Sequence, residues 1–268
     1  MPAFVKNFLI IFNYMLIRLL KSIYFNAVIY KSKILYKLRH SLKTFTLKGI
    51  RLFINDDSVL SKDVLLSLLQ GGYEDKENKI IKDNLEPGDT VLELGAGLGF
   101  NSITIAKING GKIVSYESNP YLISLIKRNQ ELNNVSFDVR NKILVSKKSG
   151  IRAMPFNIAV NVCMSSIKTY SVPGYVAAET RQIETEFIED VLAELLPTFL
   201  VVDIEGGEED FFSQPDLLTH SPVKKLMVEV HPEIIGDNAC SLVVKNIISA
   251  GFNLATESSS GSVLYFSK

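Results

Sequence analysis

The chain has 268 residues with ordinary hydrophobic, charged and glycine contents, which is enough for one good-sized α/β domain and an appendage. These values exclude disordered and fibrous proteins. The two cysteines, Cys163 and Cys240, form no CxxC pair and have no Cys/His spacing of the kind that builds a zinc site. A reducing, cytoplasmic setting is therefore expected.

The formal net charge is zero, but basic and acidic residues are separated along the chain. Residues 1–55 hold ten Lys/Arg and no Asp/Glu, which leaves 19 basic against 29 acidic residues in the remainder. This asymmetry predicts that the N-terminal part and the body have different partners.

Residues 1–42 are expected to form a basic, apolar helical arm. Its apolar run, Phe8 to Leu20, is shorter than the ~20 residues that cross a bilayer, and no persuasive signal-peptide cleavage site follows it. One interpretation is a helix that lies on an anionic membrane surface, peripheral on the inner face. The other is an arm whose apolar side packs on the body or on a second subunit.

The body is expected to be a single domain over residues 43–268 that starts with a small cap, residues 43–86. Short β-like pieces at 44–47 and 50–54 precede a helix at 61–69 that ends at Gly71-Gly72. From Pro87-Gly88 onward, apolar strands alternate with helices. Strands are expected at 90–94, 112–116, 136–145, 199–204 and 225–230, and helices at 101–108, 120–133, 184–196 and 240–250.

This alternation predicts a mostly parallel sheet of Rossmann-like α/β type with helices on both faces. Two short β-like pieces at 252–255 and 262–266 predict a terminal antiparallel hairpin, an ending typical of class I methyltransferases. A stretch at 146–181 is expected to be irregular and to carry acceptor contacts.

The most specific motif is ELGAGLGF, Glu93 to Phe100, where a strand passes into a helix. Gly95, Gly97 and Gly99 allow a tight turn and close approach of a ligand. Nicotinamide-binding domains use a similar turn, G-x-G-x-x-G. Here the spacing is G-x-G-x-G, and Glu93 would repel a pyrophosphate but suits the cationic amino-acid head of S-adenosylmethionine (SAM).

A second acidic residue, Glu117, ends the next strand and is placed to accept hydrogen bonds from both ribose hydroxyls. Together with the glycines it favours SAM over NAD as the cofactor. Asn141 could approach the adenine and Asn101 the methionyl end, although either could serve local structure instead.

These motifs resemble those of the FkbM-type methyltransferases, SAM-dependent enzymes many of which O-methylate polyketides, sugars and surface glycans. The resemblance runs from Gly71 to the C-terminus through GGYEDKE, the glycine loop, YESNP, VDIEGGEEDFF and VEVHPE. It implies a cofactor site made of Tyr73, Glu74, Glu93, Gly95, Ala96, Gly97, Asn101, Glu117, Ser118 and Asn141. The family often has a lysine two residues before the aspartate of its D-x-E-G motif, and this position is Val201 here. The role of that lysine in orienting the acceptor therefore cannot be transferred to this chain.

Four polar side chains are expected to converge beside the methyl donor. Asp203 and Glu205 are two residues apart at the end of one strand, so their side chains point the same way. Glu229 and His231 have the same spacing at the end of the next strand. Methyl transfer needs a positioned acceptor and a proton acceptor. His231 is the first candidate base and Asp203 the second. The alternative is that these groups have a purely structural role and cap strand and helix ends. A divalent metal held by these carboxylates is an open alternative, but none is expected at this point, because no Asp-Asn pair of the metal-dependent type is evident.

The sequence therefore predicts a SAM-dependent methyltransferase that methylates a hydroxyl of a sugar, glycolipid or polyketide-like acceptor. The expected partner is a small molecule or glycan. Two alternatives remain open. One is nucleic-acid methylation, in which the basic arm would contact the phosphates of the nucleic acid. The acidic body and the absence of an N/D-P-P-Y/F motif disfavour this alternative. The other is a non-catalytic SAM-binding scaffold at the membrane.

Overall fold

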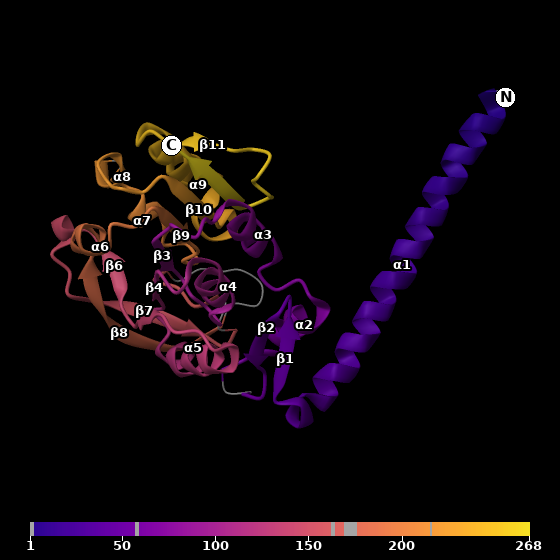
Figure 1. The fold of residues 1–268 in the computed structure, drawn as a ribbon, viewed down its shortest axis with the longest axis horizontal. Helices are drawn as coiled ribbons and strands as arrows, with labels where there is room; N and C mark the ends of the chain where they lie inside the picture. Colours follow the sequence, from indigo (N-terminus) through magenta and orange to yellow (C-terminus); the bar gives the residue numbers. More distant parts are fainter. Residues whose placement is uncertain (1–2, 57–58, 162–163, 169–175, 215) are drawn as a thin grey trace.

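A computed structural model describes residues 3–56, 59–161, 164–168, 176–214 and 216–268. The first element is helix α1 (Ala3–Leu42), which extends away from the rest of the chain and approaches it only near its C-terminal end (Figure 1). That end contacts α2, and Tyr36 packs against the core. Among the described residues, no helix is long and apolar enough to cross a membrane.

The predicted cap is present as a hairpin and a helix. Strands β1 (Thr44–Leu47) and β2 (Ile50–Phe53) pair in antiparallel fashion, and α2 (Lys62–Gln70) follows. Ser61 caps this helix by accepting a hydrogen bond from the Val64 amide, and Gly71 ends it in a left-handed conformation. The next helix, α3 (Asp75–Asn84), has no counterpart among the predicted elements.

The main sheet has seven strands in the order β11-β12-β10-β9-β3-β4-β5. The parallel strands are β3 (Val91–Leu94), β4 (Ile113–Tyr116), β5 (Asp138–Arg140), β9 (Phe199–Val202) and β10 (Lys225–Glu229). The order reverses between β3 and β9, and such a switch point creates a crevice at the carboxyl ends of the strands.

The predicted terminal hairpin is confirmed. Strand β12 (Val263–Ser267) lies between β10 and β11 (Asn253–Leu254) and is antiparallel to both. The helices that join the main strands are α4 (Phe100–Asn109), α5 (Pro120–Asn133), α6 (Ile188–Leu195), α7 (Glu208–Phe211), α8 (Asp216–Thr219) and α9 (Pro232–Ser249). Two apolar clusters fill the core, as expected for a sheet covered on both faces.

The prediction of one strand at 136–145 is wrong. The run divides into β5 and β6 (Ile143–Val145), which belong to different sheets. Strand β6 pairs with β8 (Ala177–Phe187), and β8 pairs with β7 (Ala153–Ala159), so much of the stretch predicted as irregular is a three-stranded sheet. Residues 162–163 and 169–175 of that stretch lie outside the described residues. The helix predicted from Glu184 starts only at Ile188, because β8 continues through Phe187.

Candidate active site

A large cavity of about 1060 Å³ opens at the carboxyl ends of β3, β4, β9 and β10. One wall is apolar and comes from the three-stranded sheet, with Ile143, Leu144, Met154 and Phe156. Another part of the lining is strongly acidic and includes Glu74, Glu77, Glu117, Asp203, Glu205 and Glu229. The volume is at the upper end of ordinary ligand sites and leaves room for a cofactor together with part of an acceptor.

The glycine turn brings the backbone of β3 against that of β9. Gly95 has φ +88°, and a Cβ there would lie 1.6 Å from the backbone oxygen of Asp203. Gly97, at φ +54°, faces the Tyr73 hydroxyl and the Glu74 carboxylate. Glycine is required at Gly95 because any side chain would overlap the neighbouring strand. The turn thereby sets the position of Asp203 relative to the cofactor loop.

Glu117 is anchored at the end of β4 with both carboxylate oxygens facing backbone amides. Gly97 N–H donates to Oε2 at 2.8 Å, and Asn119 N–H donates to Oε1 at 2.7 Å. Each oxygen keeps a second lone pair for a ribose hydroxyl. Burial raises the pKa of Glu117 to about 7, although the two amide hydrogen bonds oppose this.

The predicted cofactor residues divide into those that line the cavity and those that do not. Tyr73, Glu74, Gly95, Gly97, Glu117 and Ser118 line the cavity. Glu93, Ala96, Asn101 and Asn141 are not among its lining residues. The Glu93 carboxylate accepts hydrogen bonds from Ser102 and Ser115, and Asn101 accepts one from Asn78. For these four residues direct cofactor contact stays a prediction, and the contacts seen are structural.

Asn141 has a clear structural contact. Its Nδ2 donates to the carbonyl oxygens of Glu117 at 2.8 Å and of Ser118 at 3.0 Å. The side chain therefore holds the loop that carries Glu117 at the point where the chain leaves β5 for β6.

Glu74 lies in a strained turn against the glycine loop. Its φ of +46° places a non-glycine residue in the left-handed region, and such strain persists mainly where function requires it. Burial raises the pKa of Glu74 well above its usual value, and the nearby charge of Asp203 adds to this. A cationic group in the cavity would relieve this accumulation of negative charge.

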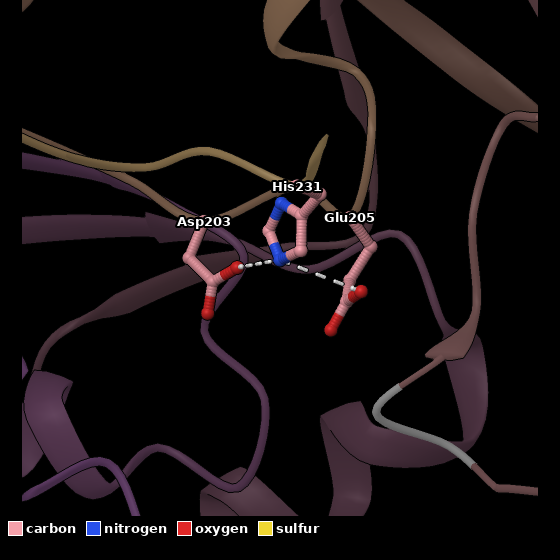
Figure 2. Close-up of side chains that lie close together, drawn as sticks. All are labelled: Asp203, Glu205 and His231. Atoms are coloured by element: carbon pink, nitrogen blue, oxygen red, sulfur yellow. Dashed lines mark ion pairs between the residues drawn. The ribbon is translucent and has the colours of Figure 1, made fainter. Parts of the chain in front are cut away.

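The four polar groups predicted to converge do so, at the ends of β9 and β10, and Figure 2 shows three of them, Asp203, Glu205 and His231. His231 Nε2 lies 3.6 Å from Asp203 Oδ1 and 3.5 Å from Glu205 Oε2. Glu229 also lines the cavity, and it accepts a hydrogen bond from Ser262. The catalytic roles of these residues stay predictions, but their proximity is that of a functional cluster.

The charges in this cluster change its proton affinities. Burial raises the pKa of Asp203 to about 7 against the opposing charge of His231. Burial lowers the pKa of His231, but the hydrogen bond with Glu208 and the charges of Asp203 and Glu205 outweigh this and raise it to about 10. Without a bound ligand His231 is therefore an imidazolium at neutral pH, which does not favour its role as the base.

Sequence reasoning missed Glu208, whose side chain is fully buried behind His231. Its Oε1 lies 3.0 Å from His231 Nδ1 and also accepts hydrogen bonds from the amides of Ile204 and Gly206. Glu208 is the last glutamate of the VDIEGGE run, so its place in that motif was the available signal. The apolar wall from the three-stranded sheet had no sequence signal.

Known proteins resemble parts of the chain. The model of the TRM5/TYW2 methyltransferase domain matches residues 64–176. The ribosomal protein L11 methyltransferase of Thermosipho africanus is 30% identical over 91 residues, which cover 34% of this chain and 35% of that protein. The ribosomal RNA small subunit methyltransferase A of Campylobacter hominis is 29% identical over 150 residues, with 52% and 55% covered. The chain thus spans about half or less of the length of these relatives.

Among solved structures, Pyrococcus horikoshii TYW2 in complex with MeSAdo is similar with a TM-score of 0.42 and 12% identity, covering 83% of this chain and 68% of that one. An O-methyltransferase from Bacillus cereus in complex with SAH has a TM-score of 0.43 at 12% identity. It covers 72% of this chain and 81% of that one.

The strand order and the glycine turn define the Rossmann-like fold of the class I methyltransferases, and the cofactor of this class is SAM. The predictions of fold class and cofactor are confirmed. The assignment to the FkbM-type family is wrong, since the matching family model is that of the TRM5/TYW2 methyltransferase domain. The expectation of a small-molecule or glycan acceptor, with nucleic acid disfavoured, is also contradicted by the match to a ribosomal RNA methyltransferase.

The pKa of Glu117 predicts how SAM affinity depends on pH. Only the ionised carboxylate accepts hydrogen bonds from both ribose hydroxyls, and with a pKa of about 7 its ionised fraction falls below neutrality. We expect the Kd for SAM to rise by about ten-fold per pH unit below pH 7, with little change above pH 8. Calorimetric titrations between pH 5.5 and 8.5 measure this. The Glu117→Gln variant should lose most of the slope, and an equal slope in that variant would assign it to another group.

Proposed function

We propose that the chain is a SAM-dependent methyltransferase whose acceptor is a nucleic acid. The observation that carries the choice of acceptor is the separation of charge between an acidic cavity and the basic helix α1. Residues 1–55 contain no Asp or Glu, and the side chains of Arg18, Lys21, Lys31, Lys33 and Lys37 are exposed. A phosphate backbone is the polyanion that such a helix would bind.

Aromatic side chains accompany these cations. Tyr24 is 73% exposed, Tyr30 is 70% exposed and Phe25 is 62% exposed. Exposed aromatic rings between basic residues can stack on unpaired bases, which supports a single-stranded or looped acceptor. The similarity to a ribosomal RNA methyltransferase supports the same choice.

The chemistry proposed for the cavity is an in-line displacement. The acceptor nucleophile forms a bond to the methyl carbon, the carbon–sulfur bond breaks, and its electron pair stays on sulfur to give S-adenosylhomocysteine. The acceptor's proton passes to the cluster of Asp203, Glu205, Glu229 and His231. Most of the rate enhancement would come from holding the three reacting atoms in line.

Transfer of a radioactive methyl group from SAM tests the proposal. Purified protein is incubated with separate RNA, DNA and protein fractions from cells that lack this chain. We expect label in a nucleic-acid fraction that nuclease removes and protease does not. Label in the protein fraction alone, or in none, would refute a nucleic-acid acceptor.

The role of α1 can be tested by its salt dependence. Replacing Lys31, Lys33 and Lys37 with glutamine should weaken RNA binding and lower the slope of log K against log salt by about 2, because each single-strand phosphate contact contributes roughly 0.7. Fluorescence anisotropy with labelled RNA at several salt concentrations measures both quantities. The matched control replaces the exposed Lys112, Lys127 and Lys224 of the body with glutamine. An equal loss in both triple variants would show a general charge effect and no role for α1.

A further inference from the structure

The Asp203, Glu205 and His231 cluster has the donor set and geometry of a cation site. One ligand atom from each residue lies within 4.8 Å of the other two. Figure 2 shows the His231 ring between the two carboxylates, with Nε2 directed at both. Nε2 lies 3.5 and 3.6 Å from the two carboxylate oxygens, and the oxygens lie within 4.8 Å of each other. Three atoms at these separations surround a point roughly 2 Å from each, which is close to the bond length of divalent metals to imidazole nitrogen and carboxylate oxygen.

The far side of His231 is organised as it is in metal sites. Nδ1 lies 3.0 Å from Oε1 of the fully buried Glu208. A carboxylate at this position holds the proton on Nδ1, so the nitrogen that can give up its proton to a metal ion is Nε2. The lone pair that this frees would face Asp203 and Glu205, whose oxygens are metal ligands as well.

One buried atom of the cluster lacks the hydrogen-bond partner it needs. It is Oδ1 of Asp203, which has none among the described residues. His231, which is 6% exposed, faces this oxygen from 3.6 Å, and its Nε2 forms ion pairs with the carboxylates of Asp203 and Glu205. Buried polar atoms of native proteins are normally satisfied, so an unpaired oxygen directed at this point indicates a missing ligand. A divalent cation that displaces the Nε2 proton of the imidazolium would bind the lone pair of Nε2 and both carboxylates together.

We propose that Asp203, Glu205 and His231 bind one divalent metal ion at the wall of the cavity. Asp203 and Glu205 line the cavity, so three protein ligands would leave coordination positions open toward the acceptor. Open positions are typical of catalytic metal sites and not of structural ones. An oxygen atom of the acceptor could occupy such a position, where the metal orients it and lowers its proton affinity. This chemical role rests on the proposed function, whereas metal binding itself does not.

Electron paramagnetic resonance with Mn²⁺ as the probe tests the site in the full-length protein. We expect one bound Mn²⁺ per chain, with at least ten-fold weaker binding in Asp203→Asn and in Glu205→Gln. Glu209→Gln is the matched control, because Glu209 is close in sequence but pairs with Lys168 at 2.6 Å. It should bind Mn²⁺ as the unaltered protein does. Thermal melting of each variant identifies loss of fold. A variant that unfolds is replaced by the more conservative Asp203→Glu, which should change the electron paramagnetic resonance spectrum of bound Mn²⁺.

Two results would overturn the inference. One is the absence of stoichiometric Mn²⁺ binding, and the other is unchanged binding in folded Asp203→Asn and Glu205→Gln. Nuclear magnetic resonance of the imidazole adds a second test, because an Nε2 that keeps its proton at neutral pH with Mg²⁺ present also contradicts metal ligation. Failure of the proposed function is distinguishable: stoichiometric Mn²⁺ binding without methyl transfer to nucleic acid would retain the site and reject the acceptor.

Discussion

Replacing Glu117 with alanine is expected to weaken SAM binding by about 100-fold or more. The carboxylate is held by the amides of Gly97 and Asn119, so it is oriented toward the cavity before the cofactor arrives. A hydrogen bond to a charged group contributes about 1.5–3 kcal/mol, and two ribose hydroxyls would supply two such bonds. Because each 1.4 kcal/mol corresponds to a factor of ten, the loss of both exceeds about 100-fold.

Isothermal titration calorimetry with SAM and S-adenosylhomocysteine measures this effect. Glu131→Ala, which removes an exposed carboxylate from α5, is the matched control and should bind normally. Glu117→Gln keeps the size of the side chain and one acceptor oxygen, so an intermediate loss is expected. The ribose role would be rejected if Glu117→Ala, still folded by its melting curve, bound SAM within about three-fold of the unaltered protein.

Replacing Gly95 with alanine is expected to destabilise the protein by about 3 kcal/mol or more. The new Cβ would lie 1.6 Å from the backbone oxygen of Asp203, and φ of +88° is itself unfavourable for an L side chain. Left-handed strain alone costs about 1–3 kcal/mol, and the overlap must in addition push β3 away from β9. For a domain of this size, the melting temperature should fall by roughly 10 °C.

Gly88→Ala is the matched control for this substitution. Nothing lies within 4 Å of a Cβ at Gly88, and its φ lies outside the positive range. We expect a change of less than about 1 kcal/mol there. Thermal unfolding followed by circular dichroism compares the two variants. Equal melting temperatures would mean that the strands can separate at Gly95 without cost, and the close approach would then not be what requires glycine.

What the sequence by itself determined is local. The caps of α2 and α5, the apolar runs of β3 and β9, and the glycine turn each depend on residues that are neighbours in the chain. Backbone preferences and hydrophobic periodicity act over such distances, so these elements could be predicted. The positions of Asp203 and His231 at strand ends followed in the same way, because parallel strands bring their carboxyl ends together.

The tertiary structure decided what depends on distant partners. The run from 136 to 145 is uniformly strand-like, yet Asn141 bonds to the loop after β4, and the chain then joins a second sheet. Thr185 to Phe187 are extended because they pair with β6, although the sequence there favours a helix. Strand propensity does not specify which strand is the partner. The Glu208 contact with His231 and the apolar wall of the cavity likewise arise only when segments far apart in the sequence pack together.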